Sequence, residues 1–196
     1  MTKRLFDLLF SFLGMVVLSP LFLIVSLFII SDSRGGVFYC QKRAGKNNKD
    51  FNLIKFRTMM TGADNRGLLT IGEQDQRITK TGRWLRKYKL DELPQLINIL
   101  KGEMSFVGPR PEVRKYVDLY SPEQAIVLSV RPGLTDYASL EYINENQVLS
   151  TFSDPEKAYM EIIMPAKLLL NLKYISEQGM ITDLEIIFKT LRKIAI

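Results

Sequence analysis

The chain has 196 residues, of which 46% are hydrophobic, and a formal net charge of +6 at pH 7. It contains no histidine, so the commonest metal ligand and the commonest general base are both absent. Its single cysteine excludes an internal disulfide and a cysteine-cluster zinc site. Any catalytic acid, base or nucleophile must therefore be a carboxylate, a lysine, a tyrosine or a hydroxyl group.

The N-terminal segment predicts a membrane helix. Residues 8–30 form an unbroken run of uncharged, mostly apolar residues. At about 1.5 Å per residue, this run is long enough to cross a hydrocarbon core of about 30 Å. Pro20 lies near its middle, and because proline removes one helix hydrogen bond and crowds the preceding turn, we expect a kink there.

The flanks of this run leave its topology open. Basic residues lie on both sides, beginning with Lys3 and Arg4, whereas a spanning helix should concentrate them on one side. A re-entrant helix hairpin, broken at Ser19 and Pro20, would keep both ends in the cytoplasm, and the Ser19 hydroxyl could bond a carbonyl that the proline leaves free. An ordinary spanning helix is the main alternative. A cleaved signal peptide fits less well, because the run exceeds the usual length of roughly 7–15 residues and no cleavage site follows.

After this segment, the sequence predicts a single globular unit that opens with two strands. The remaining length is enough for one domain with a hydrophobic core. We expect a strand at residues 37–41, a polar loop at 43–50 and a second strand at 51–58. In the second strand, the period of two places Lys55 and Arg57 on the same face, where they would present two cations side by side.

A basic stretch follows a loop-like segment at residues 62–72. Residues 76–90 carry six lysines and arginines and no acidic residue, and residues 79–89 are expected to form a connector or a helix. A basic face suits anionic lipid headgroups, phosphorylated ligands or nucleic acid, and an ordinary solvated helix surface is equally compatible.

The sharpest element is a short helix at residues 93–100, where leucine and isoleucine recur at helical spacing. Pro94 is tolerated in its first turn, and Gly102 ends it. Asp91 and Glu92 therefore lie at a helix N-terminus, where unpaired N–H groups and the helix dipole favour carboxylates. Taken alone, this position makes a simple helix cap the first interpretation of Asp91.

Two proline-containing segments follow the short helix. Residues 104–107 predict a short strand, after which Pro109 and Pro111 stiffen the backbone around Arg110. A rigidly held guanidinium suits recognition of phosphate or carboxylate, although a proline-bracketed arginine also occurs in ordinary surface turns. Residues 131–135 predict a second turn of this kind.

The C-terminal third is predicted to be helical. Residues 155–177 and 182–196 are amphipathic, and Thr182 with Glu185 has the pattern of a capping box at the start of the second helix. The apolar face of this second helix fits either packing in the core, which is the more frequent case, or an interfacial position on a membrane.

Four ordered motifs make the chain resemble a known family. They are KFRTM at residues 55–59, LDELPQL at 90–96, KGEMSFVGPRP at 101–111 and RPGLT at 131–135. The likeness begins at the opening KRLFD of residues 3–7 and extends to the C-terminal helices. In these motifs the chain resembles the bacterial sugar transferases, the monotopic phosphoglycosyl transferases. Larger members carry an additional multi-helix membrane domain, so the chain looks like the small, catalytic-only form.

This resemblance implies a fold and a reaction. The fold class would be α+β and helix-rich, with a re-entrant membrane helix hairpin at residues 1–34 and one cytoplasmic catalytic domain at 35–196 that combines a small sheet with amphipathic interfacial helices. The reaction would transfer a sugar-1-phosphate from a UDP-sugar to polyprenyl phosphate, such as undecaprenyl phosphate, and release UMP, as the first membrane step of surface glycan synthesis. The enzyme would contact lipids of the bacterial inner membrane from its cytoplasmic face.

The resemblance also implies roles for individual residues. Asp91 would be the catalytic nucleophile that attacks the β-phosphorus and forms a phosphosugar-aspartyl enzyme. Glu92 would hold Mg²⁺, a hard cation that takes oxygen ligands. The substrate phosphates would be bound by four cations and by the prolines that flank one of them: Lys55, Arg57, Arg86, Arg110, Pro109 and Pro111.

One departure from the family pattern concerns sugar recognition. Many members continue the RPGLT motif with Gly-Trp-Ala-Gln, whereas residues 136–139 of this chain are Asp-Tyr-Ala-Ser. The phosphoryl chemistry is unaffected by this departure. The sugar, the polyprenol length and the oligomeric state, including a homo-oligomer, stay open.

Two rival functions are distinguishable by experiment. Polyprenyl phosphate could attack the UDP-sugar directly in a ternary complex, with Asp91 only as a base, and UMP would then not exchange into UDP-sugar. Alternatively, the chain could be a membrane-tethered module that binds anionic lipid or nucleic acid and makes no bond. The family resemblance predicts no nucleic-acid partner, and few aromatic residues interleave with the basic ones.

Overall fold

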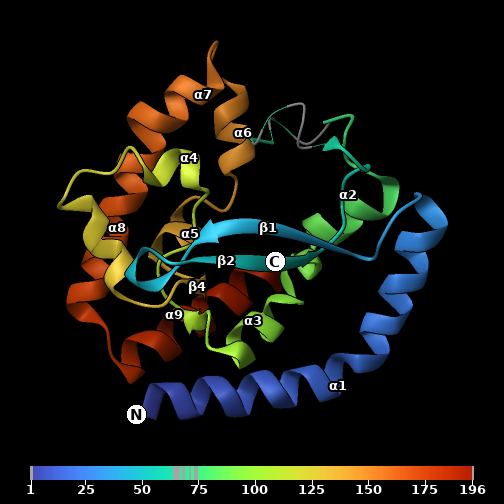
Figure 1. Cartoon of the computed structure of the whole chain (residues 1–196), viewed down its shortest axis with the longest axis horizontal. Coiled ribbons are helices and arrows are strands. Elements are labelled where there is room, and N and C mark those ends of the chain that lie inside the picture. Colours follow the sequence, from blue (N-terminus) through green and yellow to red (C-terminus); the bar gives the residue numbers. More distant parts are fainter. Residues whose placement is uncertain (1, 64–66, 68, 71, 73–74, 196) are drawn as a thin grey trace.

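The computed structural model describes residues 2–63, 67, 69–70, 72 and 75–195. This part of the chain is helix-rich α+β, with two two-stranded sheets and a long N-terminal helix that follows one side of the molecule (Figure 1). The predicted helix-rich α+β fold with a small sheet and a long apolar N-terminal helix is confirmed. The predicted loop at residues 62–72 lies partly outside the described residues.

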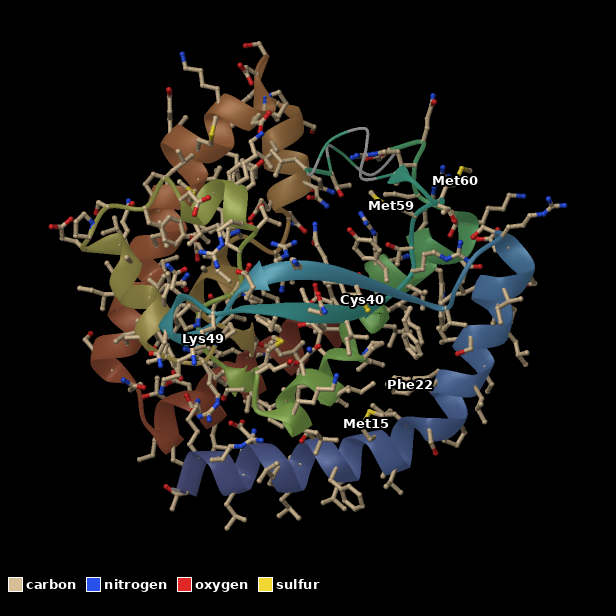
Figure 2. The ribbon with its side chains drawn as sticks, viewed as in Figure 1. Met15, Phe22, Cys40, Lys49, Met59 and Met60 are labelled. Atoms are coloured by element: carbon tan, nitrogen blue, oxygen red, sulfur yellow. The ribbon has the colours of Figure 1, made fainter. Side chains whose placement is uncertain are left out.

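Helix α1 (Thr2–Asp32) contains the whole apolar segment. By length and composition it could cross a membrane, with a mean hydropathy of 2.7, and 11% of its most apolar stretch is buried inside the protein. Figure 2 shows Met15 on the first limb of this helix and Phe22 where the second limb turns away from it. The bend therefore lies close to Pro20, and the predicted kink is confirmed.

The bend occurs within one continuous helix and not between two helices joined by a turn. Pro20 has no N–H to donate to the carbonyl of Val16, four residues earlier. The Ser19 hydroxyl donates to that carbonyl instead, at 2.8 Å. The predicted role of Ser19 as the partner of the freed carbonyl is thus confirmed, and the predicted break at Ser19 and Pro20 is a bend within one helix.

One face of α1 belongs to the hydrophobic core of the rest of the chain. Val25 and Ile29 are almost fully buried beside Phe56 and Leu85, and Met15 packs against a second core cluster. The membrane segment and the globular part therefore share a core. The opposite face exposes large apolar side chains, among them Leu5, Leu9, Phe12, Val17, Leu23 and Leu27.

The first charged residue of α1 is bound within the protein. Lys3 Nζ donates to the Val107 carbonyl at 3.0 Å and to the Tyr174 hydroxyl at 3.1 Å, and it forms an ion pair with Asp183. The Tyr174 hydroxyl in turn donates to Asp183 Oδ1 at 2.7 Å. These three residues, Lys3, Tyr174 and Asp183, form the anchor cluster. The position of Lys3 is therefore explained by the fold and carries little information about topology.

Two strands form an antiparallel hairpin across the middle of the molecule (Figure 1). β1 (Phe38–Ala44) pairs with β2 (Asp50–Phe56), and Phe38 lies opposite Phe56. β1 continues past its predicted end into the segment that was expected to be a loop. The pairing with β2 continues to Ala44 opposite Asp50, and the Ala44 N–H also donates to the Glu112 carbonyl at 3.0 Å.

The basic stretch forms helix α2 (Lys80–Lys87). Thr79 is its N-cap, and the threonine hydroxyl accepts from the Gly82 N–H at 3.0 Å. A Cβ on Gly82 would lie 2.1 Å from the Thr58 carbonyl oxygen. Glycine at this position therefore allows α2 to cross closely over the chain that leaves β2.

The predicted short helix is confirmed as α3 (Gln95–Lys101). It ends at Gly102, whose φ of 85° lies in the left-handed region that favours glycine. Arg4 of α1 donates to the carbonyls of Ile99 and Leu100 at 2.7 and 3.0 Å. A cation thus binds two carbonyls at the C-terminal end of the helix, where the helix dipole favours positive charge.

The second sheet joins the two proline segments. β3 (Ser105–Val107) pairs in parallel with β4 (Gly133–Thr135), so the turn predicted at residues 131–135 is wrong in its second half. A Cβ on Gly133 would lie 2.1 Å from the Gly108 nitrogen, so the two backbones meet where only glycine fits. Asp7 of α1 accepts two hydrogen bonds of 3.1 Å from β3.

The C-terminal part is helical, as predicted. Short helices lead to two long ones that pack beside the second sheet (Figure 1). They are α4 (Arg114–Val117), a 3-10 turn (Gln124–Ser129), α5 (Tyr137–Glu141), α6 (Glu145–Ser150), α7 (Pro155–Ala158), a π-helical turn (Tyr159–Ile163), α8 (Met164–Glu177) and α9 (Met180–Ala195).

Helix α9 begins two residues earlier than predicted, and it carries apolar side chains on two faces. Thr182 lies inside the helix and donates to the Glu177 carbonyl at 2.9 Å, while Glu185 pairs with Lys189, so the predicted capping box is wrong. One face packs in the core through the fully buried Ile186. The opposite face exposes a stripe of apolar side chains: Ile181, Leu184, Phe188 and Leu191.

Candidate active site

Two adjacent carboxylates lie on a 3-10 turn, Leu90–Glu92, between α2 and α3. Asp91 is buried, and its carboxylate makes no hydrogen bond or ion pair with any described residue. Helix α3 begins after Pro94 without a side-chain cap, so the interpretation of Asp91 as a simple helix cap is wrong. A largely buried carboxylate that lines a cavity and has no protein partner is a candidate for a chemical use.

Glu92 is bound by two cations that come from distant parts of the chain. Its Oε1 accepts from Lys55 Nζ of β2 at 3.2 Å, and Arg110 binds both carboxylate oxygens, with one contact of 3.1 Å. Burial alone would raise the pKa of Glu92, but Arg110 and Lys55 together lower it well below its usual range. Glu92 is therefore ionised and held between Lys55 and Arg110.

The environment of Asp91 raises the pKa of this carboxyl, whereas that of Glu92 is lowered. Burial raises the pKa of Asp91, and the neighbouring charge of Glu92 raises it further, against the attraction of Lys55 and Arg86. Arg86 of α2 is oriented by hydrogen bonds to the hydroxyls of Thr58 at 2.9 Å and Thr70 at 3.2 Å. Two neighbouring acids thus have different environments, one ion-paired and the other unpaired.

Most of the predicted site residues come together around one cavity of about 1460 Å³. Its walls include both proposed catalytic residues and all four predicted phosphate-binding cations. Five of these residues lie around the Asp91–Glu92 turn, and we refer to them as the central cluster: Lys55, Arg86, Asp91, Glu92 and Arg110.

Arg57 lines the same cavity, but its guanidinium is bound to backbone outside the central cluster. Its guanidinium donates to the Ser33 and Arg34 carbonyls at 2.9 and 2.6 Å, where the chain leaves the end of α1. The strand ends at Phe56, so the alternation that predicted adjacent Lys55 and Arg57 side chains does not extend to this residue. A phosphate-binding role for Arg57 stays a prediction.

The two prolines act through their backbone carbonyls. Pro109 accepts from Gly133 N at 3.0 Å, and Pro111 accepts from Arg43 at 3.2 Å. Both prolines are buried, and Arg110 between them reaches Glu92. The segment therefore holds one guanidinium rigidly, as the sequence predicted.

Sequence reasoning missed Asp136, which is fully buried. Its Oδ2 accepts from the Arg110 backbone N–H at 3.1 Å, and its Oδ1 accepts from Ser139 N at 2.6 Å. It also caps α5, and the spacing of an aspartate just before a helix start is the local signal that could have identified it. Asp136 thus fixes the backbone on which Arg110 is presented.

Part of the cavity wall is apolar. It includes Phe10, Gly14 and Leu18 of α1 and Ile187 and Leu191 of α9. The membrane helix therefore contributes directly to the cavity that holds the charged cluster. An amphiphilic ligand could occupy it with its charged group at the central cluster and its apolar part against α1.

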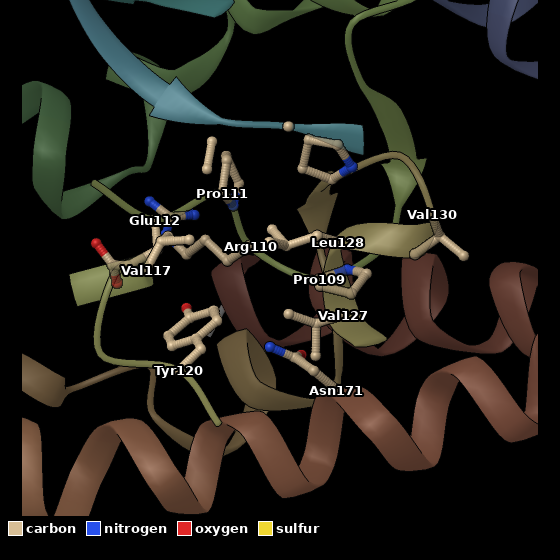
Figure 3. A pocket seen from close by; sticks show the side chains of 13 residues that line it. Pro109, Arg110, Pro111, Glu112, Val117, Tyr120, Val127, Leu128, Val130 and Asn171 are labelled. Carbon is tan, nitrogen blue, oxygen red and sulfur yellow. The ribbon is translucent and has the colours of Figure 1, made fainter. Parts of the chain in front are cut away.

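A second, much smaller cavity lies behind the proline segment (Figure 3). It is lined by Pro109, Pro111, Tyr120 and Asn171, among others, and its volume is about 20 Å³. That volume has room for about one water molecule. The larger cavity is therefore the candidate substrate site.

The donor set of the cavity fits Mg²⁺. The described residues contain no group of three or more histidine, cysteine, aspartate or glutamate side chains that could hold a metal alone. Mg²⁺ usually takes one or two carboxylates and completes its coordination with water and substrate phosphates. The Asp91–Glu92 pair places two carboxylates on the wall of the cavity, and Glu92 is already paired with Lys55 and Arg110. A metal-binding role of Glu92 stays a prediction.

The known proteins to which this chain is similar include several named as undecaprenyl-phosphate sugar transferases. An undecaprenyl-phosphate glucose phosphotransferase from Komagataeibacter xylinus is 37% identical over 198 residues, which cover 97% of this chain and 35% of the relative. A UDP-N-acetylgalactosamine-undecaprenyl-phosphate N-acetylgalactosaminephosphotransferase from Aeromonas hydrophila is 34% identical over 195 residues, which cover 98% of this chain and 43% of the relative. A UDP-glucose:undecaprenyl-phosphate glucose-1-phosphate transferase from Caulobacter vibrioides is 34% identical over 191 residues, covering 96% and 67%.

The chain thus spans less than half the length of the first two relatives. The sequence profile of the family described as Bacterial sugar transferase matches residues 1–196, which is the whole chain. Four of the five residues of the central cluster lie in the motifs on which the resemblance to this family rests: Lys55, Asp91, Glu92 and Arg110. The chain therefore belongs to the bacterial sugar transferase family.

Proposed function

We propose that this chain transfers a sugar-1-phosphate from a UDP-sugar to a polyprenyl phosphate, such as undecaprenyl phosphate, and releases UMP. The observation that carries the proposal is the large cavity, which joins a buried, unpaired carboxylate and its surrounding cations to an apolar wall of α1. An acceptor with a phosphate head and an isoprenoid tail matches both ends of it. The reaction would be a membrane step in making a surface polysaccharide.

In the proposed reaction, the Asp91 carboxylate attacks the β-phosphorus of the UDP-sugar. A bond forms between an Asp91 oxygen and phosphorus, the bond from that phosphorus to the bridging oxygen breaks, and UMP leaves with that oxygen. The phosphate of the polyprenyl acceptor then attacks the same phosphorus, which releases Asp91. The absence of a hydrogen-bond donor to Asp91 among the described residues supports this role, because its oxygens are free to react.

The cations of the central cluster would stabilise the negative charge of the phosphoryl oxygens during transfer. Lys55 and Arg110 approach from the Glu92 side, and Arg86 approaches from α2. Glu92 would hold Mg²⁺, which would neutralise charge on the phosphates when bound. Release of Glu92 from one of its two cations would free that cation for a phosphate oxygen.

We also propose that α1 is re-entrant in the bacterial inner membrane and that the globular part lies on the cytoplasmic face. Both ends of α1 are tied to the same globular unit, through Lys3 at one end and through Asp32 Oδ2, which accepts from Thr81 N at 2.7 Å, at the other. A straight spanning helix would separate its ends by about 30 Å of hydrocarbon. The exposed apolar stripe of α9 supports an interfacial position for that helix.

The topology is tested by labelling cysteines at the two ends of α1. In a Cys40→Ser background, Thr2→Cys and Arg34→Cys would be labelled from each face of sealed membrane vesicles with an impermeant maleimide. We expect both cysteines to react from the cytoplasmic face. Labelling from opposite faces would establish a spanning helix and overturn the re-entrant proposal.

The reaction is tested by UMP release from a panel of UDP-sugars with Mg²⁺ and undecaprenyl phosphate. We expect release by the wild-type chain and by Asp118→Asn, a control at an exposed aspartate, and none above background by Asp91→Asn. Release by Asp91→Asn at the wild-type rate would show that the nucleophile is misassigned. The covalent mechanism also predicts that labelled UMP exchanges into UDP-sugar without acceptor, whereas direct attack predicts no exchange.

A further inference from the structure

The large cavity has a polar lobe that the proposed chemistry does not use. It lies beyond Arg110 and is formed by α5, α6, the π-helical turn and α8. Its lining includes four polar side chains, which we name the annex: Ser139, Glu145, Tyr159 and Lys167.

The annex adjoins the central cluster through Asp136. One oxygen of this buried carboxylate binds the Arg110 backbone and the other binds the Ser139 backbone, so Ser139 lies next to the segment that presents Arg110. Arg110 and Glu145 both line the cavity, and Glu145 adds to the effect of Glu92 and Asp136 in raising the pKa of Arg110. The annex is therefore the continuation of the phosphate site.

Three of the four annex side chains have unused hydrogen-bonding capacity, whereas the Tyr159 hydroxyl donates to Glu112. Ser139 Oγ is buried and has no hydrogen-bond partner among the described residues. Lys167 Nζ donates to Glu145 Oε2 at 2.6 Å and lies 5.4 Å from the centre of the Tyr159 ring. An ammonium group has three donors and a carboxylate accepts on both oxygens, so this partly buried ion pair can bind further groups.

These groups are matched to a neutral, hydroxyl-rich ligand. A hydroxyl can donate to Glu145 and accept from Lys167 or from Ser139, and the Glu145–Lys167 pair has no net charge to attract a second phosphate. The opposite side of Asp91 is cationic, since Arg86 and the neighbouring residues of α2 line it. If the β-phosphorus of a UDP-sugar lies at Asp91, its anionic UMP group would lie toward α2 and its neutral sugar toward the annex.

We propose that the annex binds the sugar of the nucleotide donor and determines which sugar is accepted. This inference rests on the proposed function, because it takes the β-phosphorus of a UDP-sugar to lie at Asp91. Ser139 and Glu145 would make the discriminating hydrogen bonds to hydroxyl or acylamino groups of the ring. Tyr159, at the first position of the π-helical turn, would form the floor beneath Lys167.

The test is equilibrium binding of donors to protein that cannot turn over. In an Asp91→Asn background, dissociation constants would be measured for UMP, UDP-glucose, UDP-galactose, UDP-N-acetylglucosamine and UDP-N-acetylgalactosamine. The variants are Ser139→Ala and Glu145→Gln, and the control is Glu141→Gln, an exposed residue of α5 that does not line the cavity. Glu145→Gln keeps an oxygen for Lys167 and so limits disturbance of the fold.

We expect Ser139→Ala and Glu145→Gln to change the ratio of affinities for the best and second-best sugar by about tenfold, the effect of one discriminating hydrogen bond. The affinity for UMP should stay within about twofold, and Glu141→Gln should leave all values unchanged. The melting temperature of Ser139→Ala should equal or exceed that of the parent, because removal of an unpaired buried hydroxyl removes a desolvation cost.

Other results would overturn the assignment. Unchanged sugar ratios would show that the annex is structural, and an equal loss of UMP affinity would assign it to the uridine. No binding of any UDP-sugar would overturn both this inference and the proposed donor. If donors bind with the expected ratios but the wild-type chain releases no UMP, the proposed reaction fails while the sugar site stands.

Discussion

The anchor cluster and the central cluster each pair a carboxylate with a lysine, and they differ in whether every carboxylate has a partner. In the anchor cluster, Asp183 is bound by both Lys3 and Tyr174, and burial with the adjacent Asp183 charge raises the pKa of Tyr174. In the central cluster, Glu92 is paired in the same way but Asp91 has no partner among the described residues. Burial of charge alone therefore does not mark a functional site, whereas an unpaired carboxylate on a cavity wall does.

The largest expected effect separates the two clusters by function. Asp91→Asn should lower single-turnover UMP release by at least about a thousandfold, as loss of a covalent nucleophile does in other enzymes. The free energy of unfolding should be unchanged or higher, because the substitution removes a buried charge. Urea unfolding of the same preparation measures the second quantity. A variant that is both inactive and strongly destabilised would mean that Asp91 has a structural role as well.

A smaller loss is expected when the shape of a cation is changed. Arg110→Lys keeps the charge but cannot bind both oxygens of Glu92, and we expect UMP release to fall by about a hundredfold. Initial rates at saturating UDP-sugar measure this effect. Arg114→Lys, at an exposed ion pair, is the matched control and should retain the wild-type rate. Full activity of Arg110→Lys would show that only its charge matters.

The anchor cluster should respond in stability and not in chemistry. Asp183→Asn leaves Lys3 without its counter-charge and should lower the free energy of unfolding by about 2–3 kcal/mol, less than for a fully buried pair because Lys3 is partly exposed. UMP release per folded molecule should be close to wild type. Chemical denaturation and active-site titration would separate the two, and a pure loss of activity would contradict the comparison.

Arg57 tests whether a sequence motif or a tertiary contact defines the central cluster. Arg57→Gln removes charged donors from two carbonyls at the end of α1 and should lower the free energy of unfolding by about 2 kcal/mol. With the guanidinium held as observed, KM for the UDP-sugar should change less than about threefold, well below the effect at Arg110. A large increase in KM with unchanged stability would restore the predicted phosphate-binding role.

The smallest effect is expected at the bend of α1. Ser19→Ala removes the hydroxyl that serves the Val16 carbonyl and should cost about 0.5–1 kcal/mol, the usual value for one hydrogen bond. Thermal unfolding in detergent micelles measures it. Ser31→Ala is the control, because this hydroxyl also bonds a helix carbonyl but far from a proline. Equal effects of the two substitutions would show that the bend does not depend on Ser19.

Local patterns were sufficient for several elements of the fold and of the site. The apolar run with Pro20, the short helix that ends at Gly102 and the proline-bracketed Arg110 were all predicted. Each depends on backbone chemistry within a few residues, namely a missing N–H, a left-handed end position or a restricted φ. The family motifs added the adjacent Asp91 and Glu92 as candidates.

The sequence by itself therefore determined the elements, the available chemistry and the family of this protein, because period, capping and motif order are local properties of the chain. Only the tertiary structure decided which charges are free and which are bound. The Lys3–Asp183 pair, the Arg110–Glu92 pair and the engagement of Arg57 at the end of α1 join residues that are distant in sequence. Such pairs depend on packing, since burial makes an unpaired charge costly and so selects its partner.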